Sequence, residues 1–126
     1  MATDGTDFDY FGLPNLTIRP SKRDGNSKAN ANKVNQFAAD MWEVFDNAGN
    51  LLLSKHKDYG PTNISRSPGG PLNGLRVRMH DKTARINHLI DSGASPEHES
   101  LRDSFLDLLN YSAIALMVID GNWPND

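Results

Sequence analysis

Apolar residues recur every three or four positions in three stretches of the chain, and this spacing is typical of amphipathic α-helices. The three stretches cover residues 33–57, 72–92 and 97–119. The apolar positions of the first are Val34, Phe37, Ala38, Met41, Phe45, Ala48 and Leu52, and those of the second are Leu75, Met79, Ile86, Leu89 and Ile90. We therefore expect an all-α fold, a small helical bundle of three main helices.

The third stretch is the one around which we expect the bundle to form. Residues 108–119 are apolar on almost every side of a helix, interrupted only by Asn110, Tyr111 and Ser112, and such a helix belongs in the middle of a bundle. Ser95 as the N-cap and Pro96 at the first helical position predict where this helix starts. We expect it to end before Gly121, and the second helix to end at Ser92, with Gly93 following in the left-handed conformation.

Residues 42–53 also allow a second interpretation. The turn-forming residues 46–49 fit a hairpin between two short strands, and Gly49 costs roughly 1 kcal/mol inside a helix. We favour the helix because the apolar period passes through Gly49 unbroken. Lys55, His56 and Lys57 would then lie in the last turn, where positive charge suits the helix dipole.

Residues 1–32 are predicted to form a mostly irregular, flexible N-terminal arm and linker, outside a helical domain of residues 33–126. Residues 7–18 carry aromatic side chains among acids, whereas residues 19–32 are rich in Gly, Pro, Ser and Asn, a composition that cannot offset the entropy of ordering. The arm is either a mobile tail or a segment ordered by oligomerisation. Its large apolar residues are Phe8, Tyr10, Phe11 and Leu13.

Residues 58–73 are predicted to form a long loop, because Gly, Pro and Ser recur throughout them. The loop is either a plain connector or a functional loop, in which the backbone amides around Gly69 and Gly70 face an anion.

Composition narrows the class of protein. The chain of 126 residues has the length of one domain, and its net charge of −3 makes a nucleic-acid partner unlikely. The absence of cysteine excludes disulfides and cysteine metal sites. The acidic N-terminus does not fit a signal peptide, and no apolar run reaches the ~20 residues that span a membrane. We expect a soluble, cytoplasmic protein that forms homo-oligomers, since three short helices leave apolar faces uncovered.

Acidic side chains form a stripe on the third predicted helix, because Glu99, Asp103 and Asp107 follow one another at intervals of four residues. Asp40 and Glu43 form a second acidic face on the first helix. Carboxylates that converge from two helices suit Mg²⁺, a hard cation that binds oxygen ligands and bridges to substrate phosphates.

Basic side chains on the second helix complete a candidate site. Arg78, Lys82 and Arg85 would hold phosphates, and metal-assisted attack of water on a phosphoanhydride would be the natural chemistry. The alternative is an interhelical salt-bridge network without chemistry, in which Glu99 or Asp103 pairs with Lys82 or Arg85. The four histidines show no metal-binding spacing, so we assign them surface or capping roles.

Several motifs in order resemble the nucleotide-modification-associated domain family, whose members are common in bacteriophages. They are Lys57-Asp58-Tyr59-Gly60, a glycine-rich loop, Asp81-Lys82-x-x-Arg85-Ile86, and Glu99-x-x-x-Asp103-x-x-x-Asp107-x-x-Asn110-Tyr111. The resemblance covers residues 55–123. It implies a helical fold and nucleotide binding, with Lys57 and Tyr59 near the base or sugar.

That family is in turn similar to the MazG-type all-α nucleoside triphosphate pyrophosphohydrolases. Those enzymes bind Mg²⁺ through ExxE and ExxD motifs on two helices and assemble as dimers or larger oligomers. The nearest counterparts here are Asp40-x-x-Glu43 and the pair Glu99 and Asp103, which is spaced by four rather than three. The resemblance implies that these residues and Asp107 hold the metal, with Glu99 and Asp103 as the catalytic pair.

Three functional hypotheses follow. The first is a nucleotide-binding phage protein that acts as a Mg²⁺-dependent (deoxy)nucleoside triphosphate pyrophosphohydrolase in nucleotide metabolism or DNA modification. The second is a non-catalytic module that sequesters a nucleotide, using Tyr59, Lys82 and Arg85 for binding and the acids as salt-bridge partners. The third is a protein that binds a host protein through residues 1–32.

Overall fold

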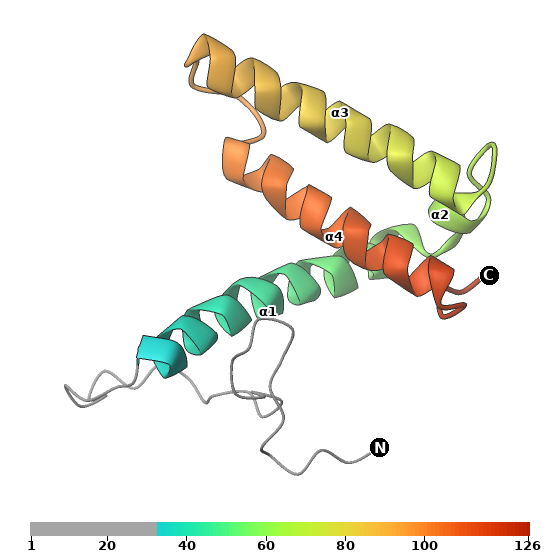
Figure 1. Ribbon diagram of the computed structural model, residues 1–126. Coiled ribbons are helices and arrows are strands. Elements are labelled where there is room, and N and C mark those ends of the chain that lie inside the picture. The colour runs from blue at the N-terminus through green and yellow to red at the C-terminus, as the bar shows by residue number, and fades with distance from the viewer. Residues whose placement is uncertain (1–32) are drawn as a thin grey trace. The chain divides into compact units, whose positions relative to one another are not determined.

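The computed structural model in Figure 1 describes residues 33–126, and the predictions for residues 1–32 lie outside this range. Within it every regular element is a helix. The four helices are α1 (Lys33–Tyr59), α2 (Thr62–Ser65), α3 (Pro71–Ser92) and α4 (Leu101–Ile119). The predicted all-α fold with three main helices is confirmed.

The chain divides into two compact units, Met1–Asn47 and Ala48–Asp126, with the boundary inside α1. The described part of the first unit is the beginning of α1, which carries Asp40 and Glu43. The second unit contains the end of α1 together with α2, α3 and α4. The domain boundary predicted after residue 32 stays a prediction.

Helix α1 runs without a break through residues 42–53. The predicted helix is therefore confirmed, and the alternative hairpin is not formed. A Cβ atom at Gly49 would meet nothing within 4 Å, and this glycine therefore costs the helix backbone entropy without serving a close contact. The helix ends at Tyr59, where Gly60 takes a φ of 67° and donates its N–H to the His56 carbonyl at 2.8 Å. A positive φ is easily adopted only by glycine, which explains the end of the helix here.

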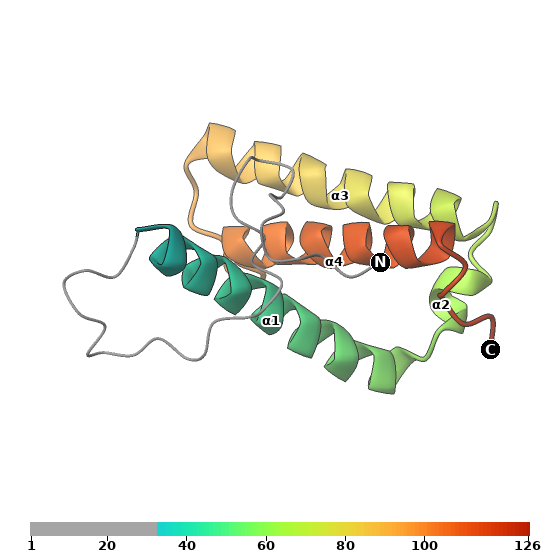
Figure 2. The same cartoon turned by 60° about the horizontal axis from the view of Figure 1, so that its bottom comes forward.

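Helices α3 and α4 lie side by side and run in opposite directions, as Figures 1 and 2 show. Pro71 occupies the start of α3, where the missing proline N–H costs nothing. At its end Gly93 is left-handed, with φ 65°, and donates its N–H to the Leu89 carbonyl at 3.1 Å. The predicted end of this helix is confirmed, as is the end of α4 before Gly121.

The predicted start of α4 at Ser95 is wrong. The N-cap is Ser100, whose hydroxyl accepts from the Asp103 N–H at 3.0 Å while the Asp103 carboxylate accepts from the Ser100 N–H at 3.1 Å. This capping box satisfies two backbone donors at once. Ser95 is followed three residues later by His98, which offers no carboxylate for the reciprocal bond, so the later start is favoured.

The predicted loop at residues 58–73 is also wrong in part, because α1 extends into it, α2 forms within it and α3 begins at Pro71. Ile64 on α2 is only 2% exposed and packs with Leu75 of α3 and Ile114 of α4. Burial of the Ile64 side chain stabilises this short helix, and the local composition of residues 58–73 does not reveal that contribution.

The core of the second unit is small. Its buried centre consists of Ile64, Leu75 and Ile114. Partly buried side chains pack against this centre: Leu52, Tyr111, Ala115, Val118 and Trp123. Several large apolar side chains of α3 and α4 are exposed, among them Val77, Ile90, Phe105, Leu116 and Ile119. The predicted homo-oligomer would use such surfaces, and assembly stays a prediction. Within residues 33–126 no helix combines the length and apolar character needed to cross a membrane.

Candidate functional site

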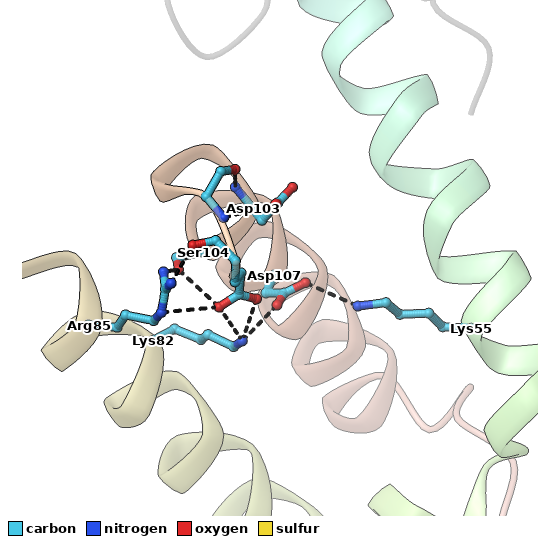
Figure 3. Close-up of polar contacts among 8 residues, drawn as sticks. Lys55, Lys82, Arg85, Asp103, Ser104 and Asp107 are labelled. Atoms are coloured by element: carbon cyan, nitrogen blue, oxygen red, sulfur yellow. Dashed lines mark hydrogen bonds and ion pairs between the residues drawn. The ribbon is translucent and has the colours of Figure 1, made fainter. Parts of the chain in front are cut away.

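The centre of the α3–α4 pair is a charged network around Lys82, drawn in Figure 3. The Lys82 ammonium on α3 lies 2.8 Å from a carboxylate oxygen of Glu99 and 2.9 Å from one of Asp107. On the opposite side of Asp107, the Lys55 ammonium from α1 lies 3.2 Å from the other carboxylate oxygen. Asp107 therefore sits between two cations, from two different helices.

Arg85, one turn beyond Lys82, extends the network towards the start of α4. It donates to the hydroxyl of Ser104 at 3.1 Å and to the backbone carbonyl of Glu99. Ser104 is completely buried and itself donates to the Glu99 carboxylate at 3.3 Å. This set of bonds holds residue 99, which precedes the N-cap, against α3. For Glu99, these contacts show the interhelical ion pairs that the sequence offered as the alternative to a metal site.

The network shifts the pKa values of its members. Burial alone would lower the pKa of Lys82, but hydrogen bonds and charges from Asp107 and Glu99 outweigh it and raise the pKa to about 12. Burial would raise the pKa of Asp107, yet the hydrogen bonds it accepts, from Lys82 and Lys55 among others, lower it below the usual value. Hydrogen bonds from Ser100 lower the pKa of Asp103. All three groups are thus held in their charged forms at neutral pH.

The predicted catalytic and metal residues in α4 and just before its start have distinct positions. Glu99 and Asp107 share the Lys82 ammonium, whereas the Asp103 carboxylate bonds to the Ser100 backbone in the capping box. All three border one open cavity of about 290 Å³, here called the acidic cavity. Its other lining residues are Leu51, Lys55 and Leu106.

As arranged, a divalent cation at these carboxylates would have to compete with the ammonium and backbone N–H groups that most of their oxygens already accept from. Within residues 33–126 no cluster of three His, Asp or Glu side chains is placed to hold a metal ion. Asp40 and Glu43 belong to the other unit. The prediction that they share Mg²⁺ with α4 stays a prediction.

A second cavity, of about 260 Å³, lies among the four helices of the second unit, and we call it the aromatic cavity. Rings from three parts of the chain contribute to it: Tyr59 near the end of α1, Tyr111 on α4 and Trp123 after α4. The Trp123 and His56 rings meet edge to face, with their centroids 5.2 Å apart. The Trp123 Nε1–H donates to the Pro61 carbonyl at 3.1 Å. Its other lining residues are Leu52, Lys55, Gly60, Asn63, Ile64, Arg78, Asp107, Asn110 and Ile114.

Arg78 is the predicted phosphate-binding residue that lines the aromatic cavity. Its guanidinium donates to the Asn63 carbonyl at 2.9 Å and to the Ser67 hydroxyl at 3.3 Å, both neutral acceptors. Within residues 33–126 it forms no ion pair with a carboxylate, whereas Lys82 and Arg85 each pair with Glu99. Of the three predicted phosphate-binding cations, Arg78 is thus the one whose charge is available to an anion.

The two residues predicted to lie near the base or sugar differ in position. Tyr59 borders the aromatic cavity although its side chain is 67% exposed. Lys57 is exposed and is not among the residues that line either cavity.

The residues of the aromatic cavity that sequence reasoning missed as site residues include Lys55, His56, Asn110 and Trp123. One of them carried a readable signal. Asn110 interrupts an apolar helix, and a buried amide needs a hydrogen-bond partner. The other three are brought together only by the packing of distant segments, which no local pattern encodes.

The Asn110 side chain is mostly buried, with 7% of the residue exposed, and its amide nitrogen has no hydrogen-bond partner within residues 33–126. The Nδ1 atom of His56, also buried, has none either. Within residues 33–126 the cavity lining therefore includes several rings, one cation without a carboxylate partner, and two residues that each carry a buried polar atom without a partner. Comparison of the chain with protein-family models, with curated proteins and with solved structures finds no match.

Proposed function

We propose that this protein binds a nucleotide in the aromatic cavity and holds it without hydrolysing it. The observation that carries the proposal is the pairing of an arginine that lacks a carboxylate partner with several rings around one cavity. A nucleotide has the matching chemistry, since its base stacks on rings and its phosphate binds a guanidinium.

Each part of the ligand has a counterpart in this arrangement. Arg78 holds a phosphate, whereas the Lys55 ammonium on the same cavity wall stays paired with Asp107. Tyr59, Tyr111 and Trp123 provide faces and edges for the base. Glu99 and Asp107 act as partners that keep Lys82 and Arg85 in place. A role in the nucleotide metabolism of bacteriophages rests on the motif resemblance alone.

Binding is favoured over pyrophosphohydrolysis because the carboxylates of Glu99, Asp103 and Asp107 are engaged in ion pairs and a helix cap. Hydrolysis would require Glu99 and Asp103 to leave these partners and face a metal together. No catalytic step through Mg²⁺ is therefore assigned to them.

Calorimetric titration of the full chain with nucleoside mono- and triphosphates, in EDTA and in Mg²⁺, tests the proposal. We expect saturable binding that EDTA does not abolish and that Arg78→Gln weakens by about tenfold or more, since a charge-assisted hydrogen bond is lost. Arg76→Gln is the matched control, because Arg76 is exposed on the same helix and its side chain, within residues 33–126, bonds to Asn73 alone. Binding that is absent in EDTA, or unchanged in Arg78→Gln, would refute the proposal.

The same samples decide between binding and hydrolysis. Pyrophosphate release that requires Mg²⁺ and stops in Asp103→Asn would establish the enzyme instead. Because Asp103 also caps α4, thermal denaturation of that variant must show that the fold survives.

A further inference from the structure

The unsatisfied amide of Asn110 has a structural cost that the fold does not recover. Asn110 is buried in the apolar half of α4, with Nδ2 lacking any partner among residues 33–126. Burying an amide donor without a hydrogen bond is unfavourable, and a leucine of similar volume would fill the same space without that cost. Such a group calls for a partner that residues 33–126 do not supply, and a ligand in the cavity would be one.

His56 presents the same feature from another helix. Its Nδ1 is buried without a partner, and its ring is held edge-on against Trp123 at 5.2 Å. His56 is at the end of α1 and Asn110 is on α4, and both line the aromatic cavity. Two residues from different helices thus line one cavity, and each carries a polar atom that has almost no exposed surface and no partner within residues 33–126.

We infer that Asn110 and His56 form a polar subsite that recognises the hydrogen-bonding edge of a nucleobase. This inference rests on the proposed function, and it adds that the base is the part of the nucleotide that lies beside Asn110 and His56. When their side chains turn toward the ligand, the Asn110 amide donates to a ring nitrogen or carbonyl oxygen of the base, and His56 Nδ1 without a proton accepts from an N–H or amino group. Planar nitrogen heterocycles carry such donor–acceptor pairs, whereas a sugar phosphate without a base lacks them.

The test compares ligands with and without a base. Wild-type protein and Asn110→Leu are titrated with the four common nucleoside 5′-monophosphates and with ribose 5-phosphate. We expect Asn110→Leu to weaken the tightest nucleotide by about tenfold or more, because a site built for hydrogen bonds loses one. Affinity for ribose 5-phosphate should not change. Ser112→Ala, at a half-buried residue of α4 that does not line the cavity, is the control.

Thermal denaturation without ligand gives an independent readout. Asn110→Leu should melt at or above the wild-type temperature, because an unpaired buried amide has been removed. A clearly lower melting temperature would mean that Asn110 has a structural partner, and would overturn the inference. If the leucine variant does not fold, Asn110→Asp replaces the donor with an acceptor of the same shape and should show the same loss of nucleotide binding.

The outcomes separate the two proposals. If the wild type binds neither nucleotides nor ribose 5-phosphate, the proposed function fails and the inference falls with it. If the wild type binds nucleotides and Asn110→Leu binds them equally well, the inference alone fails. Equal weakening of nucleotide and ribose 5-phosphate would also refute it, because the effect would then not concern the base.

Discussion

The ammonium nitrogen of Lys82 lies 2.9 Å from a carboxylate oxygen of Asp107, joining α3 to α4 by an ion pair whose side chains are only 22% and 11% exposed. Pairs of this kind differ from surface salt bridges, which contribute little. Removing one partner leaves the other charge in a poorly hydrated place. The pair therefore matters for stability irrespective of what the protein binds.

Replacing Lys82 with methionine should lower the free energy of unfolding by about 1–3 kcal/mol, because Glu99 and Asp107 lose their shared cation. The loss is limited because Arg85 still contacts Glu99 and Lys55 still contacts Asp107. Urea denaturation followed by circular dichroism measures it. Arg76→Met removes an exposed cation of the same helix and should change stability by less than about 0.5 kcal/mol. Equal stability of the two variants would show that the network is not structural.

The stability difference between wild type and Lys82→Met should depend on pH at both extremes. The pKa of Lys82 is raised in the folded state. Its contribution to the free energy of unfolding is therefore complete below pH 10.5, and it is lost as the pH rises through about 12. The pKa of Asp107 is lowered, so its contribution is present above 3.8 and is lost as the pH falls further. Urea denaturation from pH 3 to pH 12 should show a plateau between these limits. A difference that falls steadily from pH 5 to 10 would contradict this assignment.

The network was partly predictable because its acids have a local pattern. Asp103 and Asp107 lie one helical turn apart on α4, whereas Glu99, at the same spacing in the sequence, precedes the N-cap. Asp107 enters the apolar half, where a carboxylate needs a cation. Lys82 and Arg85 were the named alternative partners. Lys55 was not predicted as a partner of Asp107, because residues 55 and 107 meet only through packing.

The start of α4 and the aromatic cavity were harder to predict for different physical reasons. Ser95-Pro96 is a strong local start signal, but Ser100 and Asp103 form a reciprocal cap that Ser95 cannot. The cavity depends on Trp123, which follows α4 and reaches back to Pro61. Contacts between residues so far apart leave no periodic trace in the sequence.

The position of the N-cap leads to a direct comparison of two serines. Ser100→Ala should lower the free energy of unfolding by about 1 kcal/mol, because the Asp103 N–H loses its acceptor. Ser95→Ala should have almost no effect, since Ser95 is exposed outside any helix. Thermal denaturation of both variants provides the measurement. A larger loss for Ser95→Ala would return the start of the helix to the position first predicted from the sequence.

Two glycines inside helices should respond oppositely to alanine. A Cβ atom at Gly74 of α3 would collide with the Ser67 side chain and lie 2.9 Å from Nη1 of Arg78, whereas one at Gly49 of α1 would meet nothing within 4 Å. Gly74→Ala should therefore destabilise the protein by about 1–3 kcal/mol through overpacking. Gly49→Ala should stabilise it by about 0.5–1 kcal/mol, because alanine restricts the unfolded chain and favours the helix. Urea denaturation of both variants tests the contrast.

Because Ser67 and Arg78 bond to each other beside the aromatic cavity, Gly74→Ala should also weaken nucleotide binding, and Gly49→Ala should leave it unchanged. Stabilisation by both substitutions would mean that Ser67, which follows α2, does not approach α3 as closely as these contacts require.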